Sequence, residues 1–157
     1  MDNLAMILYR SATKNDAQYL KDLARRIINT NYAPFLGTDL TAPFIESGMS
    51  DHEIDDGLNN CTLMTCIEQI FGFAITNNDI LHLIMIDLPF QNAGHGSALL
   101  AHIEEKLFLN LKCIFLQSFK ENDVATQFYL KNGWILVSEE EVPEFGKIMS
   151  QFEKRSV

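Results

Sequence analysis

Apolar positions in the first part of the chain change their spacing, and these changes mark the expected elements. Residues 4–9 form a short apolar run that predicts a strand. Asn15 is expected to cap a helix, because the apolar residues that follow it recur at helical spacing: Leu20, Leu23, Ile27 and Ile28. Residues 31–37 interrupt this spacing, and a short acidic helix is expected from Ser50 or Asp51 to Gly57.

The middle of the chain predicts a run of strands followed by a helix. Three β-rich segments lie close together, at residues 62–68, 72–76 and 80–88. The turn-forming residues Asn77-Asn78-Asp79 separate the last two, which predicts an antiparallel meander. A helix is expected from Ser97, with an apolar face formed by Leu99, Leu100, Ile103 and Leu107 and a solvent face formed by Glu104, Glu105 and Lys106.

The last third predicts two further β-rich regions around one helix. Residues 113–119 predict a strand, and residues 122–131 predict a helix that ends at Asn132-Gly133. Residues 134–137 and 145–151 predict two final strands. The order is βααβββαβαββ, which indicates a mixed α+β sheet with helices packed on it.

Length and composition place these elements in one domain. The 157 residues contain no repeat, low-complexity tract or Pro/Gly/Ser linker, so residues 1–157 are expected to form a single domain with its own core. The three cysteines, Cys61, Cys66 and Cys113, have no zinc-ligand spacing, so reduced thiols and no metal are expected. The apolar runs are too short to cross a bilayer, and the first residues lack the basic region of a signal peptide, so a cytoplasmic protein is expected.

Charge gives a preference for a class of partner. The chain has 12 Lys and Arg against 21 Asp and Glu, a net charge of -9. This balance disfavours nucleic acid and favours cationic small molecules or basic peptides. Residues 41–60 contain five acids and no Lys or Arg, and residues 139–144 contain four acids. Both clusters fit a solvated surface, and the first also fits a site for a cationic partner.

The most informative segment is a strand, a glycine-bearing turn and a helix over residues 84–100. Gly94 and Gly96 permit a close approach of the backbone, and the following helix offers unpaired N–H groups and the positive end of its dipole. Such an arrangement binds phosphates. No Gly-Lys-Ser/Thr follows, and the third glycine of a dinucleotide fingerprint would fall on Leu99, so a P-loop and a Rossmann site are both disfavoured. Taken alone, the two glycines also fit a plain strand-to-helix corner.

Two blocks together resemble one family. Gln91-x-x-Gly94-x-Gly96 resembles the pyrophosphate loop of the GCN5-related N-acetyltransferase (GNAT) superfamily, and residues 122–134 resemble its later motif, with Asn, Ala, a hydrophobic residue, Tyr and Gly-aromatic at matching spacings. One helix and one strand separate the blocks, as in the family. Family members often have proline at the position of Leu88, whereas this chain has Pro89.

The resemblance implies a fold, an activity and a cofactor. It implies the GNAT fold, a mostly antiparallel sheet of about seven strands with a splayed parallel pair and flanking helices. It implies an acetyl-CoA-dependent N-acetyltransferase that acts on a primary amine of a small molecule or of a peptide or protein. A CoA- or partner-binding module without turnover, and an enzyme that uses another acyl-CoA, remain alternatives. Relatives commonly dimerise, so the resemblance is also compatible with a homodimer.

The resemblance assigns the residues that hold the cofactor. Pantetheine would pair with the backbone of Ile86 and Leu88. The pyrophosphate would bind backbone amides of the loop, from Gln91, Asn92, Ala93, Gly94, His95, Gly96 and Ser97. Asn122, Ala125 and Phe128 share one helical face that could line the cofactor, although ordinary packing also explains Ala125 and Phe128.

The motif also suggests catalytic and acceptor-binding residues. Tyr129 would donate a proton to the departing thiolate, and the Leu88 amide would stabilise the oxyanion. His82 is a candidate base, with Glu68, Asp87 or a water relay as alternatives, although a lone histidine in a strand is more often a hydrogen-bonded structural residue.

Acceptor binding in the superfamily involves the first helices and their loop. For this chain the expected residues are Tyr32 and Phe35, with Phe44 and the acids at 46–56, and Glu68 is a further candidate. Aromatic and acidic groups together would suit an amine with an apolar body. A small core beneath a loop explains the three aromatic residues equally well.

Overall fold

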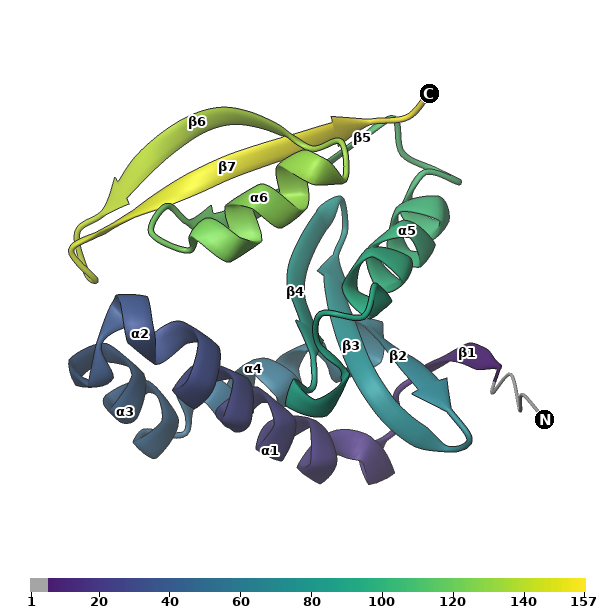
Figure 1. The fold of residues 1–157 in the computed structure, drawn as a ribbon, viewed down its shortest axis with the longest axis horizontal. Helices are drawn as coiled ribbons and strands as arrows, with labels where there is room; N and C mark the ends of the chain where they lie inside the picture. The colour runs from purple at the N-terminus through teal and green to yellow at the C-terminus, as the bar shows by residue number, and fades with distance from the viewer. Residues whose placement is uncertain (1–5) are drawn as a thin grey trace.

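Seven strands in the computed structural model, which describes residues 6–157, form one mixed sheet in the order β1-β2-β3-β4-β5-β7-β6 (Figure 1). Only β4 and β5 are parallel among these neighbouring strands, and the other pairs are antiparallel. The strands are β1 (Ile7–Ser11), β2 (Cys61–Cys66), β3 (Gln69–Asn77), β4 (Ile80–Ile86), β5 (Cys113–Phe119), β6 (Ile135–Val142) and β7 (Lys147–Arg155). The α+β class and the mostly antiparallel sheet with one parallel pair are confirmed.

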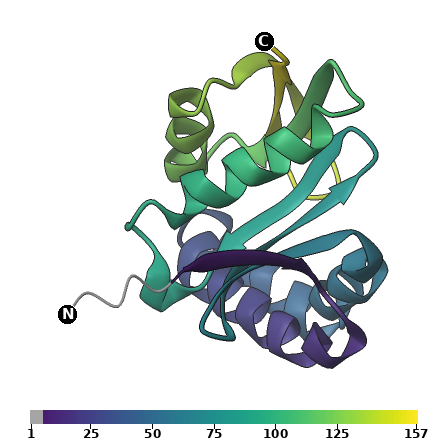
Figure 2. The same cartoon turned by 90° about the vertical axis from the view of Figure 1, so that its right-hand side faces the viewer.

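Helices cover both faces of the sheet (Figures 1 and 2). The α-helices are α1 (Ala17–Ile27), α2 (Ala33–Leu36), α3 (Thr38–Glu46), α4 (Met49–Gly57), α5 (His95–Leu107) and α6 (Asp123–Lys131). Short 3-10 turns are η1 (Lys14–Asp16), η3 (Leu58–Asn60) and η4 (Leu88–Phe90), and a π turn, η2 (Ile28–Tyr32), extends α1. Within residues 6–157, no helix is both long enough and apolar enough to cross a membrane.

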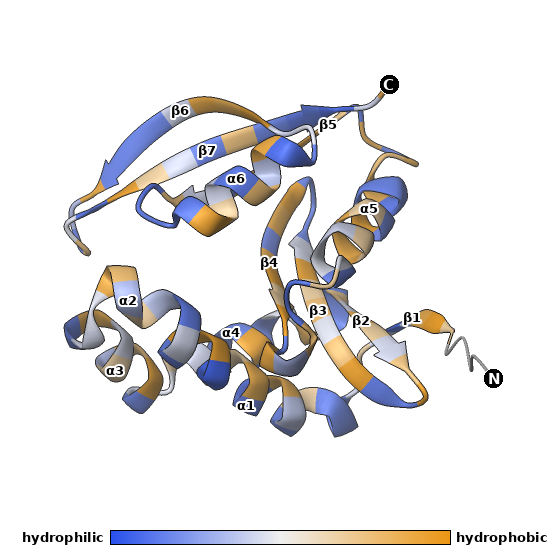
Figure 3. Cartoon of the chain, in the orientation of Figure 1, coloured by the Kyte–Doolittle hydropathy of each residue, from blue (hydrophilic) through white to orange (hydrophobic). Residues whose placement is uncertain are grey.

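Two hydrophobic clusters hold these layers together. In the first, Leu20, Leu23 and Ile27 of α1 and Ile54 of α4 pack against Phe73 and Ile75 of β3. In the second, α5 and α6 pack against the other face, where the buried residues include Leu99, Leu100, Ile103, Ile114, Leu116, Tyr129, Trp134 and Phe152. The hydrophobic colouring of β3 and β4 in Figure 3 shows why these central strands lie between the two layers. Burial of each such side chain contributes about 1.5–3 kcal/mol.

The parallel pair separates almost as soon as it forms. Among the described residues, β4 and β5 pair only at Ile80 and Phe115, where the Phe115 N–H also donates to the Asp79 carbonyl at 2.9 Å. Beyond this point the register of β4 against β3 shifts, with Thr76 opposite Leu81 and Ile75 opposite Leu83. His82 is therefore the extra residue of a β-bulge, which bends a strand. The bulge turns β4 away from β5, and the splayed pair is confirmed.

The N-terminal elements correct several sequence expectations. Part of the strand expected at residues 4–9 lies outside the described residues, and β1 runs from Ile7 to Ser11. Asn15 does not cap α1, because it lies inside η1, which precedes α1 and begins with a capping box in which the Thr13 N–H donates to Asp16 Oδ2 at 2.8 Å. Residues 31–36 are helical, and the break falls at Gly37, whose φ of 83° few other residues adopt.

Helix α3 is absent from the expected elements, and the strand boundaries also differ from those expected. Pro43 lies inside α3, where proline normally ends a helix. Ile67 and Glu68 form the turn between β2 and β3 with φ values of 47° and 62°, so the strand expected at 62–68 ends earlier. β4 ends at Ile86 because η4, with Pro89, begins at Leu88.

The C-terminal elements keep their expected order with shifted limits. α5 begins at His95, two residues before the expected Ser97, after Gly94 at φ 85°. α6 ends before Gly133, which has φ 87°, so the expected termination is confirmed. β6 and β7 extend four to five residues beyond their expected ends, because the exposed glutamates at 139–141 belong to an edge strand.

One buried carboxylate ties α5 to the C-terminal strands. Glu104 was expected in solvent, but it is 9% exposed and accepts hydrogen bonds from Trp134 Nε1 at 2.9 Å and Lys154 Nζ at 2.5 Å. Lys154 also donates to the Asn132 carbonyl at 2.8 Å. This network joins α5 to the end of α6 and to β7, across the point where the two halves of the sheet diverge.

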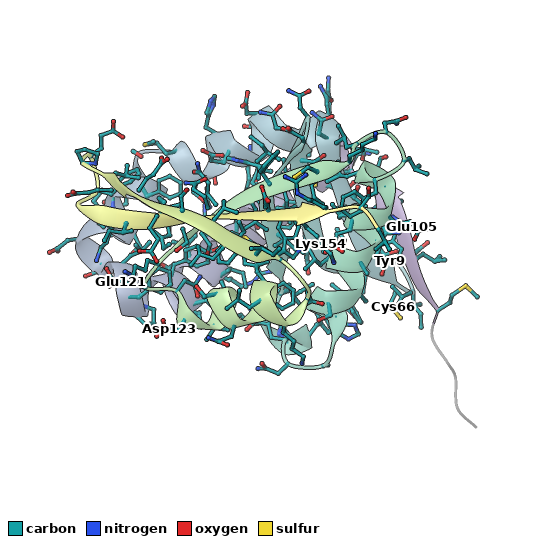
Figure 4. The ribbon with its side chains drawn as sticks, turned by 90° about the horizontal axis from the view of Figure 1, so that it is seen from above. Tyr9, Cys66, Glu105, Glu121, Asp123 and Lys154 are labelled. Carbon is teal, nitrogen blue, oxygen red and sulfur yellow. The ribbon has the colours of Figure 1, made fainter. Side chains whose placement is uncertain are left out.

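Replacement of Glu104 by alanine should therefore destabilise the fold. The Glu104→Ala variant would leave the Lys154 ammonium and the Trp134 N–H without their acceptor, at an expected cost of about 2–3 kcal/mol in the free energy of unfolding. Urea denaturation of this variant and of Glu105→Ala, an exposed neighbour on α5, measures the difference. Figure 4 labels Lys154 and Glu105. Equal stability of the two variants would show that the network contributes nothing.

Candidate active site

The diverging strands leave one edge of β4 without a strand partner. In the region beyond the bulge, the Asp87 N–H donates to the Phe71 carbonyl at 2.9 Å, on the β3 side. Because the C=O and N–H of one peptide group point in opposite directions, the Ile86 carbonyl points away from β3. We call this side of residues 83–86 the open edge of β4. An extended ligand that carries amides can pair with such an edge as a strand would.

The Gly94 loop, residues 87–94, connects the open edge to α5. Asn92 and Gly94 have φ values of 62° and 85°, which turn the chain sharply into the helix. Gly94 is the N-cap and has no side chain to accept from the first amides of α5, so the N–H groups of His95, Gly96 and Ser97 lack intrahelical partners. The loop and first turn carry no Lys or Arg, so an anion here would be bound by amides and the helix dipole.

Asp87 anchors the start of this loop. Its side chain is 6% exposed and accepts from Arg26 Nη2 at 2.9 Å, Tyr19 Oη at 3.3 Å and the Leu88 N–H at 2.9 Å. The hydrogen bond to Asp87 raises the pKa of Arg26. Burial, with the Asp87 charge as a smaller cause, raises the pKa of Tyr19. Arg26 and Tyr19 were missed in the sequence because no motif marks them.

This anchoring bears on two residues that the sequence suggested. The Leu88 N–H, expected to serve the cofactor and the oxyanion, is already hydrogen-bonded to Asp87. Asp87, an alternative base, is held in an ion pair with Arg26. Leu88 lies in η4 rather than in β4, so its backbone does not continue the open edge.

Aromatic side chains of the Gly94 loop and of the start of α5 pack against Phe71 of β3. The Phe90 ring stacks on Phe71 with a centroid separation of 3.8 Å, and the His95 imidazole meets Phe71 edge-on at 5.0 Å. The His95 side chain therefore packs against the sheet, and its backbone amide is the group available to a ligand in the first turn of α5.

Helix α6 lies against the first turn of α5. A Cβ on Gly96 would lie 3.4 Å from the Phe128 ring and 3.8 Å from Ile86, so this glycine lies close to both α6 and the open edge. Asn132 Nδ2 donates to Ser97 Oγ at 3.3 Å. Asn122 caps α6 through a bond from the Ala125 N–H to its Oδ1 at 3.1 Å, so its amide nitrogen is the part left for a ligand. The structure thus brings both sequence blocks together.

Tyr129 is buried on α6 among aromatic rings. It is 8% exposed and packs against Phe128, Trp134 and Phe152, with centroid separations of 5.3, 6.2 and 5.6 Å. Burial raises the pKa of Tyr129, and the neighbouring Tyr32 adds to the rise. The phenol therefore keeps its proton at neutral pH and can act as a donor.

The predicted acceptor-binding aromatics lie beside Tyr129. Tyr32, at the end of η2, packs against Phe35 at 5.6 Å, and Phe35 packs against Phe119 of β5 at 5.9 Å. Lys147 Nζ of β7 lies 3.5 Å from the Phe35 carbonyl and 3.0 Å from Glu121 Oε1. These contacts join the N-terminal helices to the end of the C-terminal hairpin, and Figure 4 labels Glu121 near the start of α6.

The remaining candidates occupy other positions. His82, on the bulge, has its Nε2 2.5 Å from Glu53 Oε2 of α4. Glu68 lies in the exposed turn between β2 and β3. Two of the acids of α4 are paired with α1: Asp51 with Arg25, and Asp55 with Lys21 at 3.0 Å. Much of the acidic surface at 46–56 thus serves packing between helices. In the described part of the chain, no three His, Cys, Asp or Glu residues are grouped to hold a metal ion.

Together these features make a site for an extended anionic ligand. The open edge of β4 offers backbone pairing, the first turn of α5 offers amides for phosphate oxygens, and Tyr129 on the adjoining helix α6 offers a proton donor. Such a site can hold an acyl carrier and an acceptor at once.

Comparison with known proteins agrees with this arrangement. Residues 36–154 match the family model described as the acetyltransferase (GNAT) domain. No curated protein matches the chain. The crystal structure of a GCN5-related N-acetyltransferase from Rhodopseudomonas palustris is similar with a TM-score of 0.82, at 12% identity, with 99% of each chain covered.

Two structures with bound cofactors are also similar. The PaiA N-acetyltransferase of Thermoplasma acidophilum, solved in complex with coenzyme A, has a TM-score of 0.76 and 20% identity, with 96% of this chain and 99% of that chain covered. A Bacillus anthracis structure in complex with acetyl coenzyme A has a TM-score of 0.59 and 17% identity, over 66% of this chain and 68% of that chain. At these identities the likeness shows a shared fold.

The Tyr129 phenol should titrate above the ordinary tyrosine value of about 10. Ultraviolet titration of the wild type minus Tyr129→Phe isolates this ionisation. Because the folded-state pKa is raised, the phenol contributes stability below about pH 10, and this contribution is lost as the pH rises through the folded-state value. A difference step at or below pH 10 would contradict the burial of this hydroxyl.

Proposed function

The chain belongs to the GNAT acetyltransferase family, and on this premise we propose that it binds acetyl-CoA and transfers the acetyl group to a primary amine. The acceptor is a small molecule or a peptide or protein, and it attacks directly while both substrates are bound. One observation carries the proposal: Gly96 in the first turn of α5 lies next to Ile86 on the open edge of β4 and next to Phe128 of α6, whose ring packs against Tyr129.

The cofactor site suits CoA in its chemistry. CoA has an extended amide-bearing arm and an anionic pyrophosphate, and acetyl-CoA supplies the acetyl group as a thioester. Ile86 on the open edge would pair with the arm, and the amides of residues 92–97 would bind the pyrophosphate. Leu88 would donate only after release of its bond to Asp87, which makes Ile86 the stronger of the two candidates. The CoA complex of the Thermoplasma relative supports this assignment.

Two residues would handle the protons. Transfer forms an amide bond, breaks the thioester C–S bond and leaves one proton from the amine to be removed. Tyr129 would donate to the departing thiolate, and its raised pKa keeps the phenol protonated for this role. His82 is the side-chain candidate for the base, with Nδ1 open to the proton when Nε2 is bound to Glu53, and a water relay is the alternative.

The surroundings of Tyr129 favour an acceptor with an apolar body. Tyr32, Phe35 and Phe119 provide aromatic surface next to the catalytic phenol, and these rings can contact the apolar part of an amine. Because Asp55 and Asp51 of α4 pair with Lys21 and Arg25, these two acids contribute less to the attraction of a cationic acceptor than the net charge of -9 suggests.

A thiol-release assay with acetyl-CoA tests the proposal directly. Acceptors drawn from polyamines, amino acids, aminoglycosides and basic peptides cover the classes of primary amine. Release of CoA that depends on one class would support turnover and identify the acceptor. CoA binding without release for any acceptor or acyl-CoA would favour the non-catalytic binding module, and release only with another acyl-CoA would change the donor.

Removal of the Tyr129 hydroxyl should reduce turnover without a comparable loss of cofactor binding. We expect Tyr129→Phe to lower kcat about 10²–10⁴-fold, because the thiolate loses its proton donor. The Kd for CoA, measured by calorimetry, should change little. Tyr9→Phe is the matched control, since the Tyr9 ring stacks on His102 at 3.8 Å at the other edge of the sheet. An equal loss of binding and turnover would remove the acid role from Tyr129.

The size of the residue at position 96 should set the affinity for CoA. Gly96→Ala adds a Cβ at ordinary contact distance from Phe128, so most affinity should remain. Gly96→Leu would force a branched side chain between Phe128 and Ile86, and we expect its affinity to fall more than about tenfold, equivalent to 1.4 kcal/mol. Circular dichroism checks the fold of both variants. Unchanged binding by a folded Gly96→Leu variant would contradict the placement of the cofactor.

A further inference from the structure

The open edge of β4 already carries a hydrogen-bond partner from a side chain. Gln91 Nε2 donates to the Ile86 carbonyl at 2.9 Å. On its other side, Gln91 Oε1 accepts from Asn31 Nδ2 at 3.2 Å. The Gln91 carboxamide therefore bridges the end of β4 and the π turn that follows α1, and both of its polar atoms are engaged.

We propose that the Gln91 carboxamide occupies the position of a pantetheine amide in the free protein and must be displaced before the cofactor can pair with Ile86. The inference rests on the proposed function, because it assumes that CoA lies along the open edge. It assigns a role to the Gln91 side chain, whereas the Gln91 backbone N–H donates to the Leu88 carbonyl at 3.4 Å.

The chemistry of the two groups supports this competition. A primary carboxamide and a pantetheine amide present the same pair of groups, an N–H donor and a C=O acceptor. Gln91 Nε2 lies 2.9 Å from the Ile86 carbonyl, where a donor on the cofactor arm would pair with the strand, so we infer that the two compete for this position. The half-buried position of Gln91 keeps its carboxamide at this carbonyl rather than in water.

Displacement of Gln91 would also affect η2, the turn that carries the proposed acceptor-binding residue Tyr32. Asn31 precedes Tyr32 directly, and Tyr32 packs against Phe35 and raises the pKa of Tyr129. Loss of the bond between Gln91 and Asn31 removes a restraint on this turn. Cofactor binding is thereby coupled to the turn that carries the acceptor-binding aromatics.

The Gln91→Ala variant tests the competition by calorimetry with two probes. CoA carries the amide-bearing arm, whereas adenosine 3′,5′-bisphosphate lacks the arm and binds without displacement of Gln91. The variant should bind CoA about three- to tenfold more tightly than the wild type, the value of one net hydrogen bond, with an unchanged Kd for adenosine bisphosphate. Weaker or unchanged binding of CoA would overturn the inference.

A second variant keeps the test valid if Gln91→Ala does not fold. Asn31→Ala keeps Gln91 but removes the hydrogen bond from Asn31 to Gln91 Oε1, so CoA should bind more tightly, by a smaller factor than in Gln91→Ala. Asn29 is an exposed neighbour in the same turn, and Asn29→Ala should have no effect. Equal Kd values for the two asparagine variants would contradict the bridge. If the wild type binds neither probe, the proposed function itself fails, whereas binding of both probes without any effect of Gln91 or Asn31 overturns this inference alone.

Discussion

Within the described residues, β4 and β5 pair only at Ile80 and Phe115, and the rest of this structure depends on this constraint. A central parallel pair would normally continue its hydrogen bonds along both strands, and here the His82 bulge bends β4 away after one pair. The separation exposes backbone polar groups at the middle of a sheet, where an unpaired group costs about 1–3 kcal/mol. Gln91 satisfies one of these groups, the Ile86 carbonyl, from outside the strand.

Beyond this residue pair, β4 and β5 do not hold the two halves of the sheet together in the described part of the chain. Side-chain contacts hold them together instead. On one side, Glu104 joins α5 to Trp134 and Lys154. On the other, Lys147 approaches the Phe35 carbonyl. These contacts determine how Tyr129 on α6 lies relative to the open edge of β4, so residues far from the cofactor motif contribute to the geometry of the site.

The proposed binding of an anionic cofactor by an acidic protein is compatible with the local electrostatics, which differ from the net charge of -9. The Gly94 loop and the first turn of α5 offer backbone amides and a helix N-terminus. Asp87, the carboxylate at the start of this loop, is buried and forms an ion pair with Arg26. Most acids of α4 face partners within the protein, as Asp51 does with Arg25. The net charge alone predicts neither arrangement.

Much of the fold and the main site motif could be predicted from the sequence, and the failures have physical reasons. The turn at 77–79, the Gly133 termination and the Gly94 loop were predicted because their residues have strong local preferences. Helix α3 was not expected, and it contains Pro43, a residue that normally ends a helix. The Ile67-Glu68 turn was missed because neither residue is Gly or Asn. The burial of Glu104 and the pairing of Asp87 with Arg26 depend on residues distant in sequence, which a local pattern does not reveal.

Amide hydrogen exchange with and without CoA tests the central claim, that the divergence of β4 from β5 creates the cofactor site. We expect CoA to add protection at the end of β4, on its open edge, and in residues 92–97, the proposed phosphate-binding turn. The exchange rates of β1 and β2 should not change. Protection confined to other elements, or none at saturating CoA, would contradict it.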